Sequence, residues 1–263
     1  MPVSELPKVV DAEWLASHHG DEDVVVGDVR GPNAHMRGHI PGSRPLVLGS
    51  PPPSADDATV AELAKEVALR LRRHGITGDE KLVLVDRGDG VGAMPALQLA
   101  ELAGHRNVAV LVGGIAGWDG ELAQGAVELE PVREASLEAN PAAFPTRQEL
   151  AARLDDPTLT LLDIRNQDEY TGRRGYACDP RQGHIPGARR LQLEELFGAD
   201  GRPLPPEQIR GLVGDAQEIV AYCHSVSRSA LAALALLSAG YEARNYAGSW
   251  HEWSRHPELP LQR

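Results

Sequence analysis

One cysteine and one arginine stand close together in the stretch "YCHSVSRSALAALALLSAGY", which covers residues 222–241. Cys223 begins a polar turn that contains several serines, and Arg228 follows five positions later. A thiol beside a guanidinium group loses its proton more readily, and the resulting thiolate is the nucleophilic form. Serine hydroxyl groups in the same turn can donate hydrogen bonds to whatever the sulfur carries. These residues predict nucleophilic chemistry at Cys223.

The residues around this turn predict a strand before it and a helix after it. The apolar run "EIVAY" ends at Tyr222, and an alanine- and leucine-rich segment begins at Ser229. The amino end of a helix binds anions, because its free N–H groups point into the turn and it carries about half a positive charge. A cysteine after an apolar strand is often only a small buried hydrophobic residue. The polar turn, the arginine and the helix start together favour a reactive Cys223.

The other cysteine of the chain has a different setting. Cys178 lies in "GRRGYACDPRQG", where no helix start follows it, and we expect an incidental loop thiol. Neither cysteine belongs to a group of cysteine and histidine residues with the sequence spacing of a metal site. We therefore expect no metal and no cofactor.

Composition excludes several classes of protein. The chain of 263 residues has 26 basic and 38 acidic residues and a formal net charge of -12, which argues against nucleic acid or an anionic membrane surface as a partner. Its longest strongly apolar stretch, at 230–237, is far shorter than the roughly 20 residues that cross a bilayer. The start "MPVSELPKVVDAEW" lacks the pattern of a secretory signal. We expect a cytoplasmic protein whose two cysteines are free thiols.

The chain contains an internal repeat. "VVVGDVR" at 24–30 returns as "LTLLDIR" at 159–165, whereas "GHIPGS" at 38–43 returns as "GHIPGA" at 183–188. The first pair is 135 positions apart (159 minus 24) and the second is 145 positions apart (183 minus 38). The second copy therefore carries a ten-residue insertion between these two motifs.

Each copy alternates short apolar runs with helix-like segments, which is typical of a parallel sheet covered by helices. We expect an α/β protein with two domains, at 1–125 and 147–263, each a small, mostly parallel sheet flanked by helices. The segment 126–146 has prolines and scattered charges without a sustained period, and it is predicted to be a linker.

The repeated "D-x-R" and "GHIPG" elements, the "YCHSVSRSA" turn and the final "AGSWHEW" together resemble the tandem rhodanese family, the thiosulfate and 3-mercaptopyruvate sulfurtransferases. The resemblance covers nearly the whole chain. It implies an inactive first domain, in which Asp86 replaces the cysteine, and a catalytic second domain. Cys223 would carry a sulfane sulfur as a persulfide from thiosulfate or 3-mercaptopyruvate to cyanide or a thiol, including a protein thiol such as that of a thioredoxin. The substrate-binding residues implied are those of the turn and the insertion: His224, Ser225, Val226, Ser227, Arg228, Ser229, Arg173 and Arg174.

Two residues depart from the family pattern. Val226 stands where many relatives have glycine, and because valine avoids a positive φ, we expect a loop of different shape there. Glu169 stands where well-studied tandem enzymes have an arginine that meets the anionic substrate. We expect Glu169 to repel the donor unless an arginine of the insertion replaces the missing cation, the candidates being Arg173, Arg174 and Arg181.

Two other functions fit the same turn. A persulfide relay or docking module would exchange sulfur only with a protein thiol and would show no saturable turnover of small donors. A phosphatase or arsenate reductase would also use the cysteine, but those enzymes have Cys-x5-Arg, a wider cradle than the Cys-x4-Arg found here.

Polar residues that recur in both copies are predicted to be structural, since one copy lacks a cysteine: Asp28, Arg30, Asp163, Arg165, His39 and His184. Trp250, in the final loop of the second copy, is expected to pack inside the domain or to line the mouth of its pocket.

Overall fold

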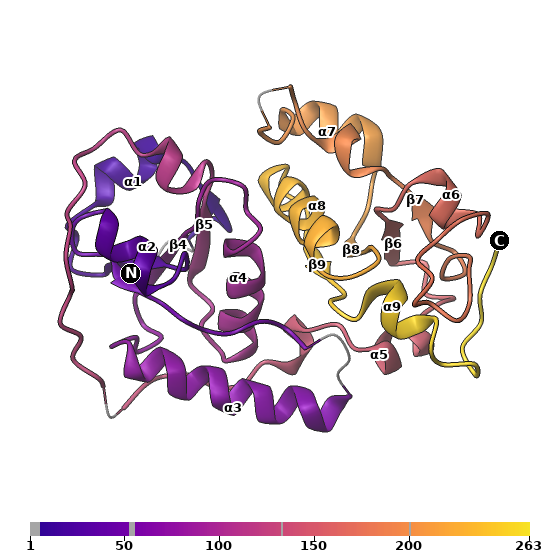
Figure 1. The fold of residues 1–263 in the computed structure, drawn as a ribbon, viewed down its shortest axis with the longest axis horizontal. Coiled ribbons are helices and arrows are strands. Elements are labelled where there is room, and N and C mark those ends of the chain that lie inside the picture. The colour runs from indigo at the N-terminus through magenta and orange to yellow at the C-terminus, as the bar shows by residue number, and fades with distance from the viewer. Residues whose placement is uncertain (1–5, 53–55, 133, 200) are drawn as a thin grey trace. The chain divides into compact units, whose positions relative to one another are not determined.

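The computed structural model describes residues 6–52, 56–132, 134–199 and 201–263, and the chain divides into two compact units (Figure 1). The first unit comprises Met1–Ser50 with Ala61–Ala143, and the second comprises Pro51–Val60 with Phe144–Arg263. Each unit contains one sheet. None of the helices in the described ranges is both long enough and apolar enough to cross a membrane.

The first sheet has five parallel strands in the order β1-β5-β4-β2-β3. The strands are β1 (Val9–Val10), β2 (Val24–Asp28), β3 (Arg44–Pro45), β4 (Lys81–Val85) and β5 (Val108–Leu111). The helices that accompany them are α1 (Ala12–His18), α2 (Pro32–Arg37), α3 (Asp57–Arg73) and α4 (Ala93–Leu102). Two 3-10 turns follow, η1 (Gly114–Gly117) and η2 (Pro141–Ala143).

The second sheet has four parallel strands in the order β7-β6-β8-β9. The strands are β6 (Leu159–Asp163), β7 (Arg189–Arg190), β8 (Glu218–Tyr222) and β9 (Ala243–Asn245). The helical elements are α5 (Arg147–Ala152), α6 (Gln167–Tyr170), η3 (Leu193–Leu196), α7 (Pro206–Val213), α8 (Ser227–Ser238) and α9 (Ser249–Trp253).

Strand β8 lies inside the second sheet, and its side chains alternate between two cores. Ile219 and Ala221 pack with residues of α7 and α8. Val220 and Tyr222 pack with residues of α5 and α9. Cys223 continues the first set. The alternation therefore places its side chain on the face that α8 covers.

Two parallel sheets flanked by helices confirm the expected fold class. The linker expected at 126–146 stays a prediction, and in the structure the residues up to Ala143 group with the first unit. This segment has little regular structure, but its backbone groups pair with that unit. Three hydrogen bonds to backbone carbonyls hold it, from the N–H groups of Val132 to Arg72, Ser136 to Thr77 and Asn140 to Leu102.

Candidate active site

Cys223 follows β8 directly, at the carboxyl end of the second sheet, which is the edge where parallel sheets bind their ligands. Its side chain is buried, with 1% of its surface exposed. Ser229, in the first turn of α8, donates a hydrogen bond from Oγ to Cys223 Sγ at 3.3 Å. Ser249 Oγ accepts the backbone N–H of Cys223 at 3.2 Å and lies 4.0 Å from Sγ. Two hydroxyl groups therefore contact the predicted nucleophile.

The turn between β8 and α8 is strained at Val226. Its φ is 49° and its ψ is -60°, and the backbone N–H of Ser227 donates to the carbonyl of Ser225 at 2.6 Å. This is a γ-turn with a positive central φ, which is rare and strained for a β-branched residue. The expectation that valine avoids a positive φ here is wrong. The surrounding turn holds Val226 in a conformation that glycine would adopt more easily.

Several backbone N–H groups of this turn have no hydrogen-bond acceptor among the described residues. The N–H groups of Ser225, Val226, Arg228 and Ser229 donate to no other residue in the part of the chain that the structure describes. The last two belong to the first turn of α8, where the helix dipole adds positive potential. The turn therefore has donors available for an anionic group on the sulfur.

The equivalent turn of the first unit holds a carboxylate. Asp86 follows β4 as Cys223 follows β8, and its oxygens accept hydrogen bonds from three backbone N–H groups of the turn, those of Gly88 at 2.8 Å, Gly92 at 3.2 Å and Ala93 at 3.1 Å. The last two donors correspond to Arg228 and Ser229, because "LAGH" and "SAGY" align the helices that precede them. The first unit therefore demonstrates that this type of turn binds a negative group.

Arg228 forms a two-pronged ion pair with Glu169 of α6, at 2.8 and 2.9 Å. Glu169 is buried, and it also closes a capping box with Asn166 at the start of α6. Burial alone would raise the pKa of Glu169, but the hydrogen bonds and charge of Arg228 outweigh it and hold that pKa below its ordinary value. The expected repulsion of the donor by Glu169 took no account of this pairing with Arg228. The two charges neutralise each other.

A pocket of about 520 Å³ opens beside this ion pair. Its walls come from the start of α6, from the insertion and from the segment before η3: Asn166, Gln167, Asp168, Glu169, Arg174, Gly175, Tyr176 and Gln192. Tyr176 also stacks on His224, with ring centroids 3.7 Å apart. The pocket therefore touches two partners of the cysteine turn, through Glu169 and through Tyr176.

The arginines of the insertion have different positions. Arg174 lines the pocket. Arg173 is exposed and forms an ion pair with Asp168. Arg181 donates to four backbone carbonyls, those of Trp253, Ser254, His256 and Leu259. Arg174 is therefore the insertion arginine that the structure places against the pocket, whereas Arg181 supports the chain after α9.

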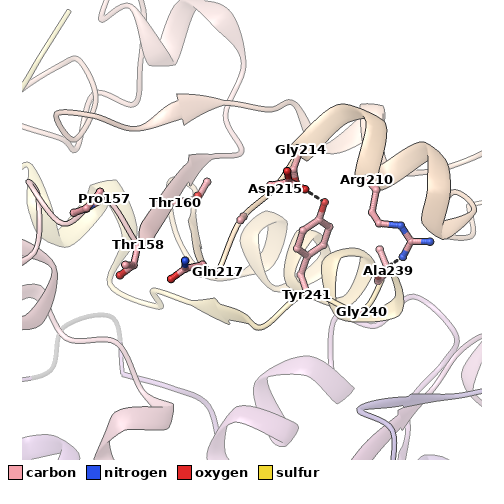
Figure 2. Close-up of a pocket in the computed structure, with 11 residues that line it drawn as sticks. Pro157, Thr158, Thr160, Arg210, Gly214, Asp215, Gln217, Ala239, Gly240 and Tyr241 are labelled. Carbon is pink, nitrogen blue, oxygen red and sulfur yellow. Dashed lines mark hydrogen bonds between the residues drawn. The ribbon is translucent and has the colours of Figure 1, made fainter.

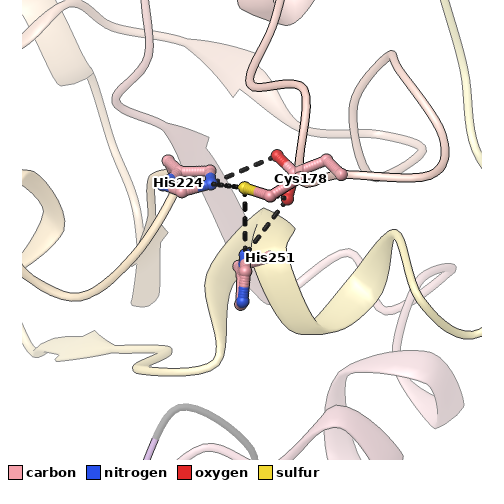
Figure 3. A group of neighbouring side chains, drawn as sticks. Cys178, His224 and His251 are labelled. Atoms are coloured by element: carbon pink, nitrogen blue, oxygen red, sulfur yellow. Dashed lines mark hydrogen bonds and ion pairs between the residues drawn. The ribbon is translucent and has the colours of Figure 1, made fainter.

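His224 belongs to a cluster with the second cysteine (Figure 3). Cys178 Sγ lies 3.8 Å from His224 Nε2 and 4.0 Å from His251 Nδ1, and Asp179 lies against both imidazoles. Burial lowers the pKa of His224 and outweighs the opposing effect of Asp179. The structure brings Cys178 together with other metal-ligating residue types, which the sequence spacing did not lead us to expect. Sequence spacing hid the cluster because its members come from three distant segments.

Ser249 is a site residue that the motifs did not indicate. It has a φ of 53°, and Gly114 has a φ of 47° at the equivalent position of the first unit, 135 residues earlier (249 minus 114). The backbone therefore needs a positive φ in both units, and the second unit accepts the strain of a serine there. The replacement of glycine by serine between the two copies was the signal that could have identified it.

The recurring polar residues are structural, as predicted. Arg165 is buried, binds Asp163 through its guanidinium group and donates to the carbonyl of Gly183 at 2.7 Å. Arg30, Asp28 and Gly38 form the same arrangement in the first unit. His184 Nδ1 lies 2.8 Å from the Tyr170 carbonyl, and His39 Nδ1 lies at the same distance from the His35 carbonyl.

Trp250 is fully buried and packs in the core, so it does not line a pocket mouth.

A second pocket, of about 560 Å³, lies at the opposite end of the second sheet, where β6 and β8 begin (Figure 2). Thr158, Thr160 and Gln217 line it from the sheet side, and Tyr241 and Arg210 donate to nearby carbonyls at 2.7 and 2.9 Å. Its lining residues include neither cysteine nor histidine. The candidate nucleophile Cys223 lies instead at the carboxyl end of the sheet.

Comparison with known proteins agrees with this geometry. The rhodanese-like domain family matches residues 11–121 and again residues 146–256. A Pseudomonas aeruginosa protein named "Probable 3-mercaptopyruvate sulfurtransferase" is 34% identical, with 97% of each chain covered. A second protein of that organism, named "Thiosulfate sulfurtransferase", is 28% identical, with 98% of each chain covered. A crystal structure described as a probable thiosulfate sulfurtransferase superimposes with a TM-score of 0.71 at 30% identity, covering 92% of this chain and 98% of that one. The chain belongs to the rhodanese family and contains two tandem rhodanese-like domains, which confirms the resemblance read from the sequence.

Proposed function

We propose that this chain is a cytoplasmic sulfurtransferase that carries a sulfane sulfur on Cys223 from thiosulfate or 3-mercaptopyruvate to cyanide or a thiol. One observation carries the proposal. The buried sulfur of Cys223 lies in a turn with open N–H donors, and the equivalent turn of the first unit binds the carboxylate of Asp86. Asp86 has no sulfur, so the first domain is inactive in this scheme.

The reaction proceeds by two displacements. The Cys223 thiolate attacks the outer sulfur of thiosulfate, the S–S bond of the donor breaks, and sulfite leaves with the bonding electrons. With 3-mercaptopyruvate, the C–S bond breaks, and the enolate of pyruvate leaves and takes up a proton. In the second displacement an acceptor attacks the outer sulfur of the persulfide, and the Cys223 thiolate leaves. Cyanide becomes thiocyanate, and a thiolate becomes a persulfide.

The turn stabilises the anion at both stages. The Ser229 hydroxyl already donates to Cys223 Sγ, and the open N–H groups of the turn are available to the negative outer sulfur of a persulfide. Arg228 does not bring a net positive charge, because Glu169 neutralises it. Preorganised dipoles therefore provide most of the stabilisation, and Arg174 is the cation at the neighbouring pocket.

The acceptor is most simply a small molecule. Cys223 is 1% exposed, so a bulky partner would have to present its thiol on a narrow segment. A protein thiol such as that of a thioredoxin remains part of the proposal on that condition. Both cysteines are unpaired in the structure, which fits a reducing compartment.

Intact-protein mass spectrometry tests the proposal. The reduced chain is exposed separately to thiosulfate and to 3-mercaptopyruvate, and we expect the mass to rise by one sulfur atom and to return when cyanide is added. Cys223→Ser should not gain the sulfur, and the control Cys178→Ser should gain it. No mass increase with either donor would refute the enzyme. An increase only when a protein persulfide is the donor would favour the relay module.

A further inference from the structure

A second chemical site lies beside the cysteine turn, where four side chains from three segments converge (Figure 3). Cys178 and Asp179 come from the insertion, His224 follows Cys223, and His251 lies on α9. Each offers one atom of a type that binds metal ions, and these atoms all lie within 4.8 Å of one another. The sulfur-transfer scheme above does not use this group.

We propose that Cys178, Asp179, His224 and His251 bind one divalent zinc ion. One thiolate, two imidazoles and one carboxylate are four ligands that zinc accepts in tetrahedral sites. The donor set is softer than the all-oxygen sets that select magnesium or calcium. Cys178 is exposed and the two histidines are partly exposed, so an ion can enter from solvent.

The distances between the donor atoms fit this geometry. Zinc bonds of the usual lengths, at tetrahedral angles, separate two nitrogen or oxygen ligands by roughly 3.3 Å and a sulfur from a nitrogen by roughly 3.6 Å. His224 Nε2 lies 3.3 Å from Asp179 Oδ2 and His251 Nδ1 lies 3.1 Å from Asp179 Oδ1, so each imidazole faces a different oxygen of the carboxylate. Cys178 Sγ lies 3.8 and 4.0 Å from the two imidazole nitrogens. Small side-chain movements would complete the tetrahedron.

A buried carboxylate oxygen supports this assignment independently. The side chain of Asp179 is 1% exposed, and the nearest donor to its Oδ2, His224 Nε2 at 3.3 Å, does not form a well-aligned hydrogen bond with it. The other oxygen, Oδ1, faces His251, the thiol of Cys178 and, at 3.4 Å, the guanidinium group of Arg255. A buried carboxylate oxygen without a well-aligned donor is costly, and a cation at this point would satisfy it.

The surrounding residues orient the ligands. Tyr176 stacks on the ring of His224, and the backbone N–H of His251 donates to the carbonyl of His224 at 3.0 Å. Arg255 donates to the carbonyls of Cys178 and His251 at 2.6 and 2.5 Å. Such contacts around the ligands preorganise metal sites. A bound ion would fix His224, the neighbour of the nucleophile, and would place positive charge at the edge of the turn.

Metal titration of the whole chain tests this site without any sulfur donor, so the result does not depend on the proposed sulfur transfer. The reduced chain is stripped with a chelator and titrated with zinc by calorimetry and with cobalt by absorption. We expect one equivalent to bind, and cobalt should give a thiolate charge-transfer band with strong visible bands typical of tetrahedral coordination. Cys178→Ser should lose the charge-transfer band and weaken zinc binding by more than about 100-fold, because even residues that only orient a ligand contribute about 10- to 100-fold.

Two further variants make the assignment specific. Cys223→Ser removes the other thiol and should keep both the band and the affinity, and His251→Gln should weaken zinc as Cys178→Ser does. Each variant is first checked by circular dichroism for native secondary structure. The proposal is overturned if the wild-type chain shows no saturable site, if Cys178→Ser weakens zinc by less than about tenfold, or if the band depends on Cys223 instead.

Discussion

The ion pair between Arg228 and Glu169 gives the sharpest test of how this site handles an anionic donor. Glu169→Gln keeps the size of the side chain and its ability to accept from Asn166, but it removes the negative charge that neutralises Arg228. A charged guanidinium group without a counter-ion would then lie next to residue 169, which lines the 520 Å³ pocket. We expect the variant to bind thiosulfate more tightly and to use it more efficiently.

The size of the gain follows from the charge removed. Glu169 is 5% exposed, so solvent screens its charge only partly. A unit charge roughly 7 Å from an anion, at an effective dielectric near 20, interacts with it by about 2 kcal/mol. That corresponds to about a 30-fold gain in kcat/KM, expressed mainly in KM. Glu169→Arg, which sequence comparison alone would suggest, is expected to be worse, because it places two guanidinium groups against each other.

Steady-state kinetics with thiosulfate at two salt concentrations measures the effect, which should shrink as salt rises. Asp168→Asn is the matched control. It also removes a carboxylate from the pocket wall, but Asp168 is half exposed and paired with Arg173, so we expect less than about a twofold change. An unchanged KM in Glu169→Gln, or an equal gain in Asp168→Asn, would refute the charge argument. Thermal unfolding of both variants checks that each remains folded.

The strained and buried residues give four more predictions. Val226→Gly should raise the free energy of unfolding in urea by about 1 kcal/mol, because it relieves a positive φ. Ser249→Gly should leave stability unchanged or higher but lower kcat about tenfold, since it removes a hydroxyl group near Cys223 Sγ. Asp86→Ala should cost about 1–3 kcal/mol in the same urea assay, by orphaning backbone donors, while kcat/KM for folded protein changes less than about twofold. The ion pair with Arg228 holds the pKa of Glu169 below its ordinary value of 4.5, so this pair stabilises the fold fully at pH values above 4.5. The stability gap between wild type and Glu169→Gln, measured by urea unfolding, should therefore close as pH falls further.

The fold could be predicted from the sequence because its signals are local and repeated. Apolar runs such as 81–85 and 218–222 became buried strands, and the recurrence of "GHIPG" identified two copies of one domain. The two-residue strands β1, β3 and β7 could not be found, since two residues carry no period. The attachment of 126–143 to the first unit could not be predicted either, because it depends on hydrogen bonds to distant backbone groups and not on composition.

The site could be predicted only as far as contiguous residues define it. Cys223, Arg228 and Ser229 lie in one turn, so their spacing was enough to predict them as nucleophile, cation and hydroxyl donor. Arg228 and Glu169 are 59 positions apart, so their pairing could not be predicted from the sequence. The departure at Glu169 from the family pattern showed only that the charge at this position had changed. No sequence signal indicated the cluster around Cys178, because two of its members, Cys178 and Asp179, belong to an insertion that lies far along the chain from the two histidines.

The two turns support the proposal that the second unit carries the chemistry and the first does not. In the first unit the carboxylate of Asp86 accepts hydrogen bonds from the N–H groups of its own turn, and Gly114 adopts a positive φ without strain. In the second unit the donors are left open, and a valine and a serine both accept a positive φ. These features lower local stability, and one of them, Ser249, places its hydroxyl group 4.0 Å from Cys223 Sγ. Strained residues and unsatisfied donors surround Cys223, whereas Asp86 has neither around it among the described residues. A site that is preorganised for an anionic intermediate requires such features.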